Sequence, residues 1–186
     1  MPYPSQVDAE TIVKTAREMI ENEGAEKLSL RVLAKELGIK APSLYRHVGS
    51  KDGLVKAVNE LTMHAMVAAL ENSLDREQPI TEQLMSIGHA YRAFATKNPA
   101  CYTLAYNSPR DATRPDPAMR EALVLPVQAL FGQLVGEEQS FAAIRGAYAM
   151  LHGWVMLEIL QQFERGGDLD AHFEQALRAY LAGWSA

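Results

Sequence analysis

The chain has 186 residues, of which 48% are hydrophobic and 22% are charged, and its formal net charge at pH 7 is −5. This balance is typical of an ordinary soluble globular protein. One cysteine, Cys101, excludes an internal disulfide framework and a cysteine-based metal cluster, so we expect a reducing, cytoplasmic setting. The first residues lack the pattern of a signal peptide, and the longest apolar stretch, 147–160, is too short to cross a bilayer. We therefore expect no membrane partner.

Charge is distributed unevenly along the sequence. Residues 1–60 carry nine basic and nine acidic side chains, whereas the remainder carries nine basic and 14 acidic ones. The window 27–56 has seven basic residues and only two acidic ones, Glu36 and Asp52. A basic window on an acidic chain indicates a local contact with a polyanion, although a solvated charged face gives the same pattern.

The sequence predicts an all-α protein, because apolar residues recur at spacings of three and four and strand-like alternation is absent. The first helix follows Asp8 as its N-cap and stops at Gly24. A second, short helix spans about 30–37, with Ser29 as its cap and Gly38 just past its end. A third begins at residue 41, with a proline in its first turn, and ends near residue 47. Ser50 then caps a long fourth helix.

Five further helices are predicted after the fourth. The first spans about 80–97 and follows Pro79, and the second begins at Pro99. The last three span about 118–135, 138–165 and 169–184. Segment 107–117 is dense in Pro, Asp and Ser and predicts an exposed loop. We therefore expect nine helices, in an N-terminal three-helix domain (6–66) that the fourth helix joins to a C-terminal bundle (67–186).

The segment 29–48 has the spacing of a helix-turn-helix. Two helices that cross closely need a small residue at the contact, which Ala34 supplies. The chain must then reverse through a left-handed position, which suits Gly38, and Leu44 of the next helix is placed to fill the shared core. The third helix would present short basic or hydrogen-bonding side chains, as a recognition helix does.

Here the sequence resembles the DNA-binding domain of the TetR family. The motif reads Leu30-Arg31-x-Leu33-Ala34-x-x-Leu37-Gly38, then Pro42-Ser43-Leu44-Tyr45-Arg46-His47-Val48 and Ser50-Lys51. The resemblance implies phosphate contacts by Ser29, Tyr45 and Lys51. It implies base-edge or nearby contacts by Arg31, Lys40, Ala41, Pro42, Ser43 and Arg46, and we add His47 of the same helix. Ala41 is small and apolar where some members carry a hydrogen-bonding side chain.

The C-terminal part is similar to a TetR subgroup with a His-Gly pair, here His152-Gly153, on the penultimate helix. In such proteins the last two helices form a four-helix interface with a second subunit. The resemblance thus implies a homodimer, which suits a helix-turn-helix that reads only a half-site of a pseudo-palindromic operator. The candidate interface residues are Gly146, Ala149, Gly153, Phe173, Leu177, Tyr180 and Trp184. Internal packing is the alternative role for the small residues among them.

A ligand pocket would lie inside the bundle. Methionine suits an adaptable pocket, and tyrosine offers a polar tip in an apolar cavity. The candidates are Met63, Met66, Tyr91, Phe94, Tyr102, Tyr106, Met150, His152 and Met156. Each of them is also compatible with an ordinary place in the core.

The function expected from these features is that of a DNA-binding transcriptional regulator, a repressor released from its operator by a small lipophilic or amphipathic effector. A ligand-independent, architectural DNA-binding role is the alternative, and a helical-bundle enzyme is a remote one. No nucleophile elbow or phosphate loop occurs, and His64, His89, His152 and His172 are too scattered for a zinc site. We therefore expect no enzyme activity, no cofactor and no metal.

Overall fold

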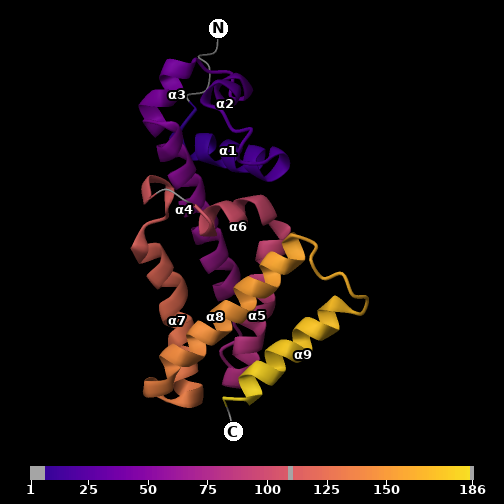
Figure 1. Ribbon diagram of the computed structural model, residues 1–186. Coiled ribbons are helices and arrows are strands. Elements are labelled where there is room, and N and C mark those ends of the chain that lie inside the picture. Colours follow the sequence, from indigo (N-terminus) through magenta and orange to yellow (C-terminus); the bar gives the residue numbers. More distant parts are fainter. Residues whose placement is uncertain (1–6, 109–110, 185–186) are drawn as a thin grey trace. The chain divides into compact units, whose positions relative to one another are not determined.

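The computed structural model describes residues 7–108 and 111–184 (Figure 1). Within these residues the regular structure is entirely helical. The α-helices are α1 (Ala9–Glu23), α2 (Leu30–Glu36), α3 (Ala41–Val48), α4 (Lys51–Asn72), α5 (Ile80–Lys97), α6 (Pro99–Tyr106), α7 (Pro117–Val135), α8 (Glu137–Ile159) and α9 (Leu169–Ala182), with a short 3-10 helix, η1, at Asp111–Thr113. The predicted all-α fold is confirmed.

The chain divides into two compact units. The first comprises Met1–His64 and Asn98–Met119, and the second comprises Ala65–Lys97 and Arg120–Ala186. The predicted division near residue 66 lies close to the first of these boundaries. The prediction assigned 98–119 to the C-terminal domain, however, whereas this segment, which contains α6, groups with the N-terminal unit.

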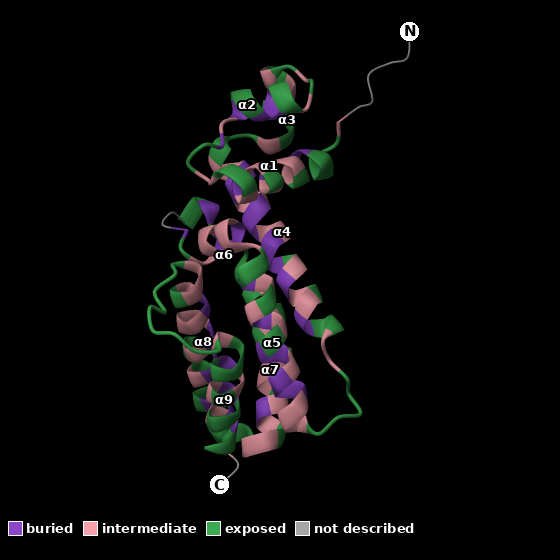
Figure 2. Ribbon diagram, turned by 90° about the vertical axis from the view of Figure 1, so that its right-hand side faces the viewer, coloured by how far each residue is buried: buried purple, intermediate pink, exposed green. Residues whose placement is uncertain are grey.

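The first unit is built around a core from α1 to α4. Ile12, Ala16 and Ile20 form the buried stripe of α1, at the helical spacing that the sequence predicts. Figure 2 shows the buried positions of these helices in purple. The other fully or nearly fully buried members of the core are Leu28, Leu33, Ala34, Leu44, Leu54, Val58 and Cys101. Desolvation by burial raises the pKa of the Cys101 thiol to about 12, which keeps it protonated.

Glu21 explains why α6 belongs to the first unit. The backbone N–H groups of Ala100 and Cys101, in the first turn of α6, donate to the two carboxylate oxygens of Glu21, each at 3.0 Å. Arg17 Nη2 of the same helix, α1, donates to Asn98 Oδ1 at 2.7 Å. The first N–H groups of a helix have no partner within it, so a carboxylate from α1 satisfies and caps α6.

The segment 107–117 is anchored, and its description as an exposed loop is only partly correct. Ser108 and Thr113 are buried, and their hydroxyls hydrogen-bond to each other. The side-chain amide of Asn59, a buried residue of α4, donates to the Thr113 carbonyl at 2.7 Å. A partner 54 residues away in the sequence therefore holds the segment, and composition alone gives no sign of this contact.

In the second unit α5 packs against α8 and α9. Gly88 of α5 permits this approach, because a side chain there would collide with Leu177 of α9. Arg92 donates to Glu158 of α8 at 2.7 and 2.8 Å and pairs with Asp170 of α9 at 2.7 Å. The hydrogen bonds to Glu158 raise the pKa of Arg92, so one guanidinium links three helices.

The end of α8 differs from the prediction, which extended this helix to residue 165. The helix stops at Ile159, because Gln161 adopts a left-handed backbone with φ of 54°. The N–H of Gln162 donates to the Leu157 carbonyl at 2.8 Å, and the N–H of Gln161 donates to the Glu158 carbonyl at 3.0 Å. This is a Schellman termination, in which glutamine occupies the position that glycine usually takes.

Candidate nucleic-acid interface

The turn between α2 and α3 has the geometry that its sequence predicts. Gly38 has φ of +65°, a conformation that glycine adopts without the strain of a side chain. Its N–H donates to the Lys35 carbonyl at 3.1 Å, and the N–H of Ile39 donates to the Ala34 carbonyl at 2.9 Å. These two bonds close α2 and direct the chain into α3. Leu44 of α3 is fully buried in the core of the unit.

In helix α3 Leu44 is buried, Ala41 and Val48 pack partly against the core, and most of the other side chains are exposed. Tyr45 is 50% exposed although it is a large aromatic residue. Arg46 and His47 are exposed beside it, and Arg46 Nη2 donates to Ser43 Oγ at 3.3 Å. At the start of the helix Lys40 and Pro42 are exposed, and Ala41 and Ser43 are half-buried. The predicted recognition residues thus share one solvent-facing helix, which an α-helix reading a major groove requires.

Ser29 and Ser50 cap the N-termini of α2 and α4, the helices that precede and follow α3 in the chain. Ser29 Oγ accepts from the N–H of Val32 at 3.1 Å and caps α2, while Ser50 Oγ accepts from the N–H of Gly53 at 3.0 Å in the first turn of α4. Each hydroxyl retains its proton for donation to an acceptor such as a phosphate oxygen. The exposed N-termini of helices also favour anions, which agrees with the phosphate contacts expected of Ser29 and Lys51.

Gly53 is a positioning residue that the sequence reasoning missed. A Cβ atom built on Gly53 would lie 2.5 Å from the carbonyl oxygen of Val48, the last residue of α3. Any side chain at 53 would therefore push the start of α4, with Lys51, away from α3. The available signal was a glycine in the first turn of a long helix, a position that normally favours other residues.

The cationic side chains of this surface are not neutralised within the described residues. The ion pairs there use Lys14 with Glu10 and Lys56 with Glu60, and none of them includes the exposed residues Arg31, Lys40, Arg46 and Lys51. The basic window predicted from the sequence is therefore an exposed positive surface. Such a surface attracts a polyanion such as the DNA backbone.

The nine candidate ligand residues fall in both units. Met63, Tyr102 and Tyr106 belong to the first unit, and Met66, Tyr91, Phe94, Met150, His152 and Met156 to the second. An apolar cavity in the second unit has about 480 Å³ of empty space, part of it open to solvent. It is lined by Leu70 of α4, Ile87 and Tyr91 of α5, Leu123, Val124 and Val127 of α7, and Ile144, Ala147, Tyr148 and Leu151 of α8. Of the nine candidates only Tyr91 lines this cavity, and ligand contact by all nine stays a prediction.

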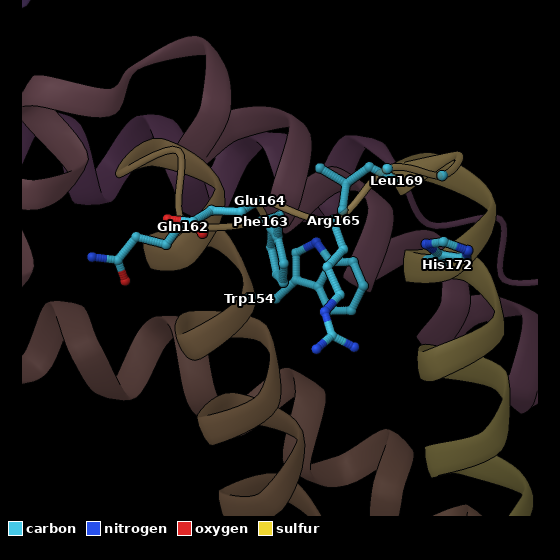
Figure 3. Close-up of a pocket in the computed structure, with 9 residues that line it drawn as sticks. Trp154, Gln162, Phe163, Glu164, Arg165, Leu169 and His172 are labelled. Carbon is cyan, nitrogen blue, oxygen red and sulfur yellow. The ribbon is translucent and has the colours of Figure 1, made fainter.

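A second hollow lies in the same unit at the connection between α8 and α9 (Figure 3). The rings of Trp154 and Phe163 lie against each other, with centroids 4.9 Å apart, while Arg165 extends beside them and His172 lines the hollow from α9. None of the candidate ligand residues lines it.

The candidate interface residues also separate into two groups. Phe173 and Leu177 are buried inside the protomer, and a side chain at Gly146 would collide with Tyr180, whose hydroxyl donates to the Ala143 carbonyl at 2.5 Å. These residues serve internal packing, which was the alternative role for the small residue Gly146. Ala149 is exposed, a Cβ on Gly153 would meet no atom within 4 Å, and Trp184 is half-buried.

The described residues give two further results on other classes of site. Nowhere in 7–108 or 111–184 do three His, Cys, Asp or Glu side chains gather in a way that could hold a metal ion. Among the helices of those segments, none has both the length and the apolar composition needed to cross a membrane.

Known proteins resemble the chain over both units. The family described as "Bacterial regulatory proteins, tetR family" matches residues 12–58, and "Tetracyclin repressor-like, C-terminal domain" matches residues 84–180. YobS, an HTH-type transcriptional regulator of Bacillus subtilis (strain 168), is 29% identical over 175 residues, which are 92% of this chain and 90% of YobS.

Two solved structures have the same fold. A protein of unknown function from Rhodococcus sp. RHA1 gives a TM-score of 0.81 at 22% identity, covering 100% of both chains. BioQ with its natural double-stranded DNA operator gives a TM-score of 0.68 at 18% identity, covering 96% of this chain and 98% of BioQ. Since the family models extend over the helix-turn-helix and most of the C-terminal region, the chain belongs to the TetR family of helix-turn-helix transcriptional regulators.

Proposed function

We propose that this TetR-family regulator is a repressor, not an enzyme, that binds a pseudo-palindromic operator as a homodimer and leaves it when a small lipophilic or amphipathic effector binds in the second unit. The observation that carries the proposal is the exposed, unpaired basic surface around α3, which has no role in the core of its own unit. BioQ, a protein of the same fold, binds a double-stranded DNA operator.

The contacts to DNA divide into two kinds. Tyr45 and Lys51, together with the capping hydroxyl of Ser29, would bind phosphates, which fixes position without reading sequence. Arg46 and Lys40 on α3 would reach base edges in the major groove, where an arginine pairs best with guanine. Arg46 must leave Ser43 to do so, since its Nη2 donates to the Ser43 hydroxyl in the free protein.

A homodimer through α8 is supported by the small, open positions of that helix. Ala149 and Gly153 lie four residues apart, both face away from the protomer core, and Leu157 and Leu160 follow them with 41% and 56% of their surface exposed. Small residues at this spacing let a second helix approach closely, and the two leucines supply apolar surface to bury.

An effector acts only through a difference in its affinity for the DNA-competent and DNA-incompetent states. The apolar cavity of the second unit offers such a binding site, and α4 supplies Leu70 to its wall. The same helix begins with Lys51, a candidate phosphate contact. DNA and the effector would therefore both act on the conformation of α4.

Selection of bound duplexes from a random-sequence library tests this function. We expect an inverted repeat whose half-sites lie about 10–10.5 base pairs apart or a multiple of that, since one recognition helix reads each half-site. A reporter gene placed behind the selected operator should be expressed less in the presence of the protein. Recovery of no common sequence would contradict operator recognition and favour an architectural role.

A further inference from the structure

The cavity of the second unit has an uncharged interior. Nearly all of its ten lining residues are aliphatic or alanine, and the two polar side chains among them are the phenols of Tyr91 and Tyr148. An ionised group taken into such an interior without a partner is strongly disfavoured. A charged part of any ligand must therefore stay at the rim of the cavity.

Arg120 is an exposed residue of α7, one helical turn before the first residues of that helix that line the cavity. It precedes Leu123, Val124 and Val127 at spacings of three, four and seven residues, so it shares the stripe of α7 that lines the cavity. Tyr148 is 43% exposed and therefore stands where the cavity opens. Burial raises the pKa of the Tyr148 phenol, and the positive charge of Arg120 acts on it in the opposite direction.

Two other titratable groups of α8, His152 and Arg145, lie within four residues of Tyr148. His152 stacks on Tyr148 with ring centroids 5.6 Å apart, and burial lowers the pKa of His152, so its ring is neutral at pH 7. The Arg145 guanidinium lies over the ring of Phe141, 5.8 Å from its centroid. Arg120 is in none of the ion pairs within residues 7–108 and 111–184.

An acidic side chain lies at a neighbouring hollow. A smaller hollow shares Leu70, Ile87, Leu123 and Val127 with the cavity and is lined in addition by Glu71. An anionic head would be repelled there and attracted at Arg120. The shared aliphatic residues then form the site for an apolar tail.

We propose that the cavity takes a single-chain anionic amphiphile, with its carboxylate or similar head on Arg120 at the Tyr148 rim and its tail among the aliphatic residues. This inference rests on the proposed effector function and names the chemical class of the effector. A charge-assisted hydrogen bond to arginine would fix the orientation of the head.

The test compares three probes with the same ten-carbon chain, sodium decanoate, 1-decanol and decyltrimethylammonium, by isothermal titration calorimetry on the full chain without DNA. We expect decanoate to bind at least tenfold more tightly than the other two. Arg120→Gln should weaken decanoate about 10- to 100-fold and change 1-decanol less than twofold. Arg76→Gln, a change of the same kind at an exposed arginine of the same unit that does not line the cavity, should change neither.

Val124→Trp tests the cavity without changing Arg120. Val124 lines the cavity and is 40% exposed, so a larger side chain there is compatible with folding. The substitution should weaken decanoate at an unchanged melting temperature. Equal binding of decanoate and 1-decanol, tighter binding of the cation, or no binding of any probe would each overturn the proposal. Decanoate that binds but leaves the affinity for operator unchanged would instead contradict the effector function and not the ligand class.

Discussion

Adjacent residues of the DNA-binding unit have opposite roles. Leu44 is fully buried and holds α3 in the core, whereas Tyr45 is 50% exposed and free to contact a phosphate. The capping residues could also be predicted from the sequence. Asp8, the predicted N-cap of the first helix, accepts through Oδ1 from the Thr11 N–H at 2.8 Å. Such features depend on neighbours within four residues and are therefore visible in one sequence.

Lys51 provides the first test at this scale. Lys51→Ala should reduce the magnitude of the slope of log K against log salt concentration by about one, because one fewer phosphate is neutralised. Affinities for operator and for unrelated duplex should fall by similar factors. Lys14→Ala is the matched control, since Lys14 is exposed on α1 and paired with Glu10. An unchanged slope for Lys51→Ala would mean that this side chain does not touch the backbone.

The two glycines of α8 provide a second test. Gly146→Ala should lower the free energy of unfolding by about 1–3 kcal/mol, because the new methyl group collides with Tyr180. Gly153→Ala meets no atom within 4 Å in the protomer, so in a monomeric background such as Ala149→Glu it should raise the free energy of unfolding by about 0.5–1 kcal/mol through helix propensity. Urea denaturation at one fixed protein concentration measures both variants. Equal effects would show that Gly146 is not held against Tyr180.

At the scale of elements, the number and order of the helices could be predicted from the sequence, whereas some contacts between distant helices could not. Proline and capping serines fix where helices begin, so the starts of α3, α4 and α6 lie within about one residue of their predicted positions. The contact of Glu21 with α6 joins residues 79 and 80 apart, and no local pattern encodes it. The end of α8 was misplaced because Gln161 takes a left-handed conformation without being glycine.

The cap on α6 can be removed by one substitution. Glu21→Gln should lower the free energy of unfolding by about 1–2 kcal/mol, since the amide has one acceptor oxygen for two backbone donors and no charge for the helix N-terminus. Glu18→Gln, an exposed position on the same helix, is the control and should change stability by less than about 0.5 kcal/mol. Thermal and chemical unfolding that leave both variants equal to the parent would contradict the capping role.

At the scale of the whole molecule, the sequence predicted the family and the all-α fold, whereas the lining of the cavity in the second unit could not be predicted from it. The helix-turn-helix residues are local and lie together on one exposed surface. The predicted ligand residues are mostly methionine and tyrosine, whereas the apolar cavity of the second unit is lined mainly by aliphatic side chains from four helices. Which apolar side chain faces a cavity depends on tertiary packing, which composition does not contain.

Assembly is tested at an exposed position of α8. Ala149→Glu should yield a monomer that binds operator poorly, because a charge would be buried in the proposed interface without a partner. Ala129→Glu places the same charge at an exposed position of α7 and should remain a dimer. Size-exclusion chromatography with light scattering gives both masses. An intact dimer for Ala149→Glu would move the interface away from this face.

The central claim is sequence-specific recognition by the exposed face of α3, and the ratio of two affinities tests it most directly. Fluorescence anisotropy would compare the selected operator with a scrambled duplex at one physiological salt concentration. We predict that the operator binds at least about 10³-fold more tightly. Arg46→Ala should reduce that preference at the half-site position it reads, by about 1–3 kcal/mol. Equal affinity for the two duplexes, unchanged by Arg46→Ala, would contradict the account.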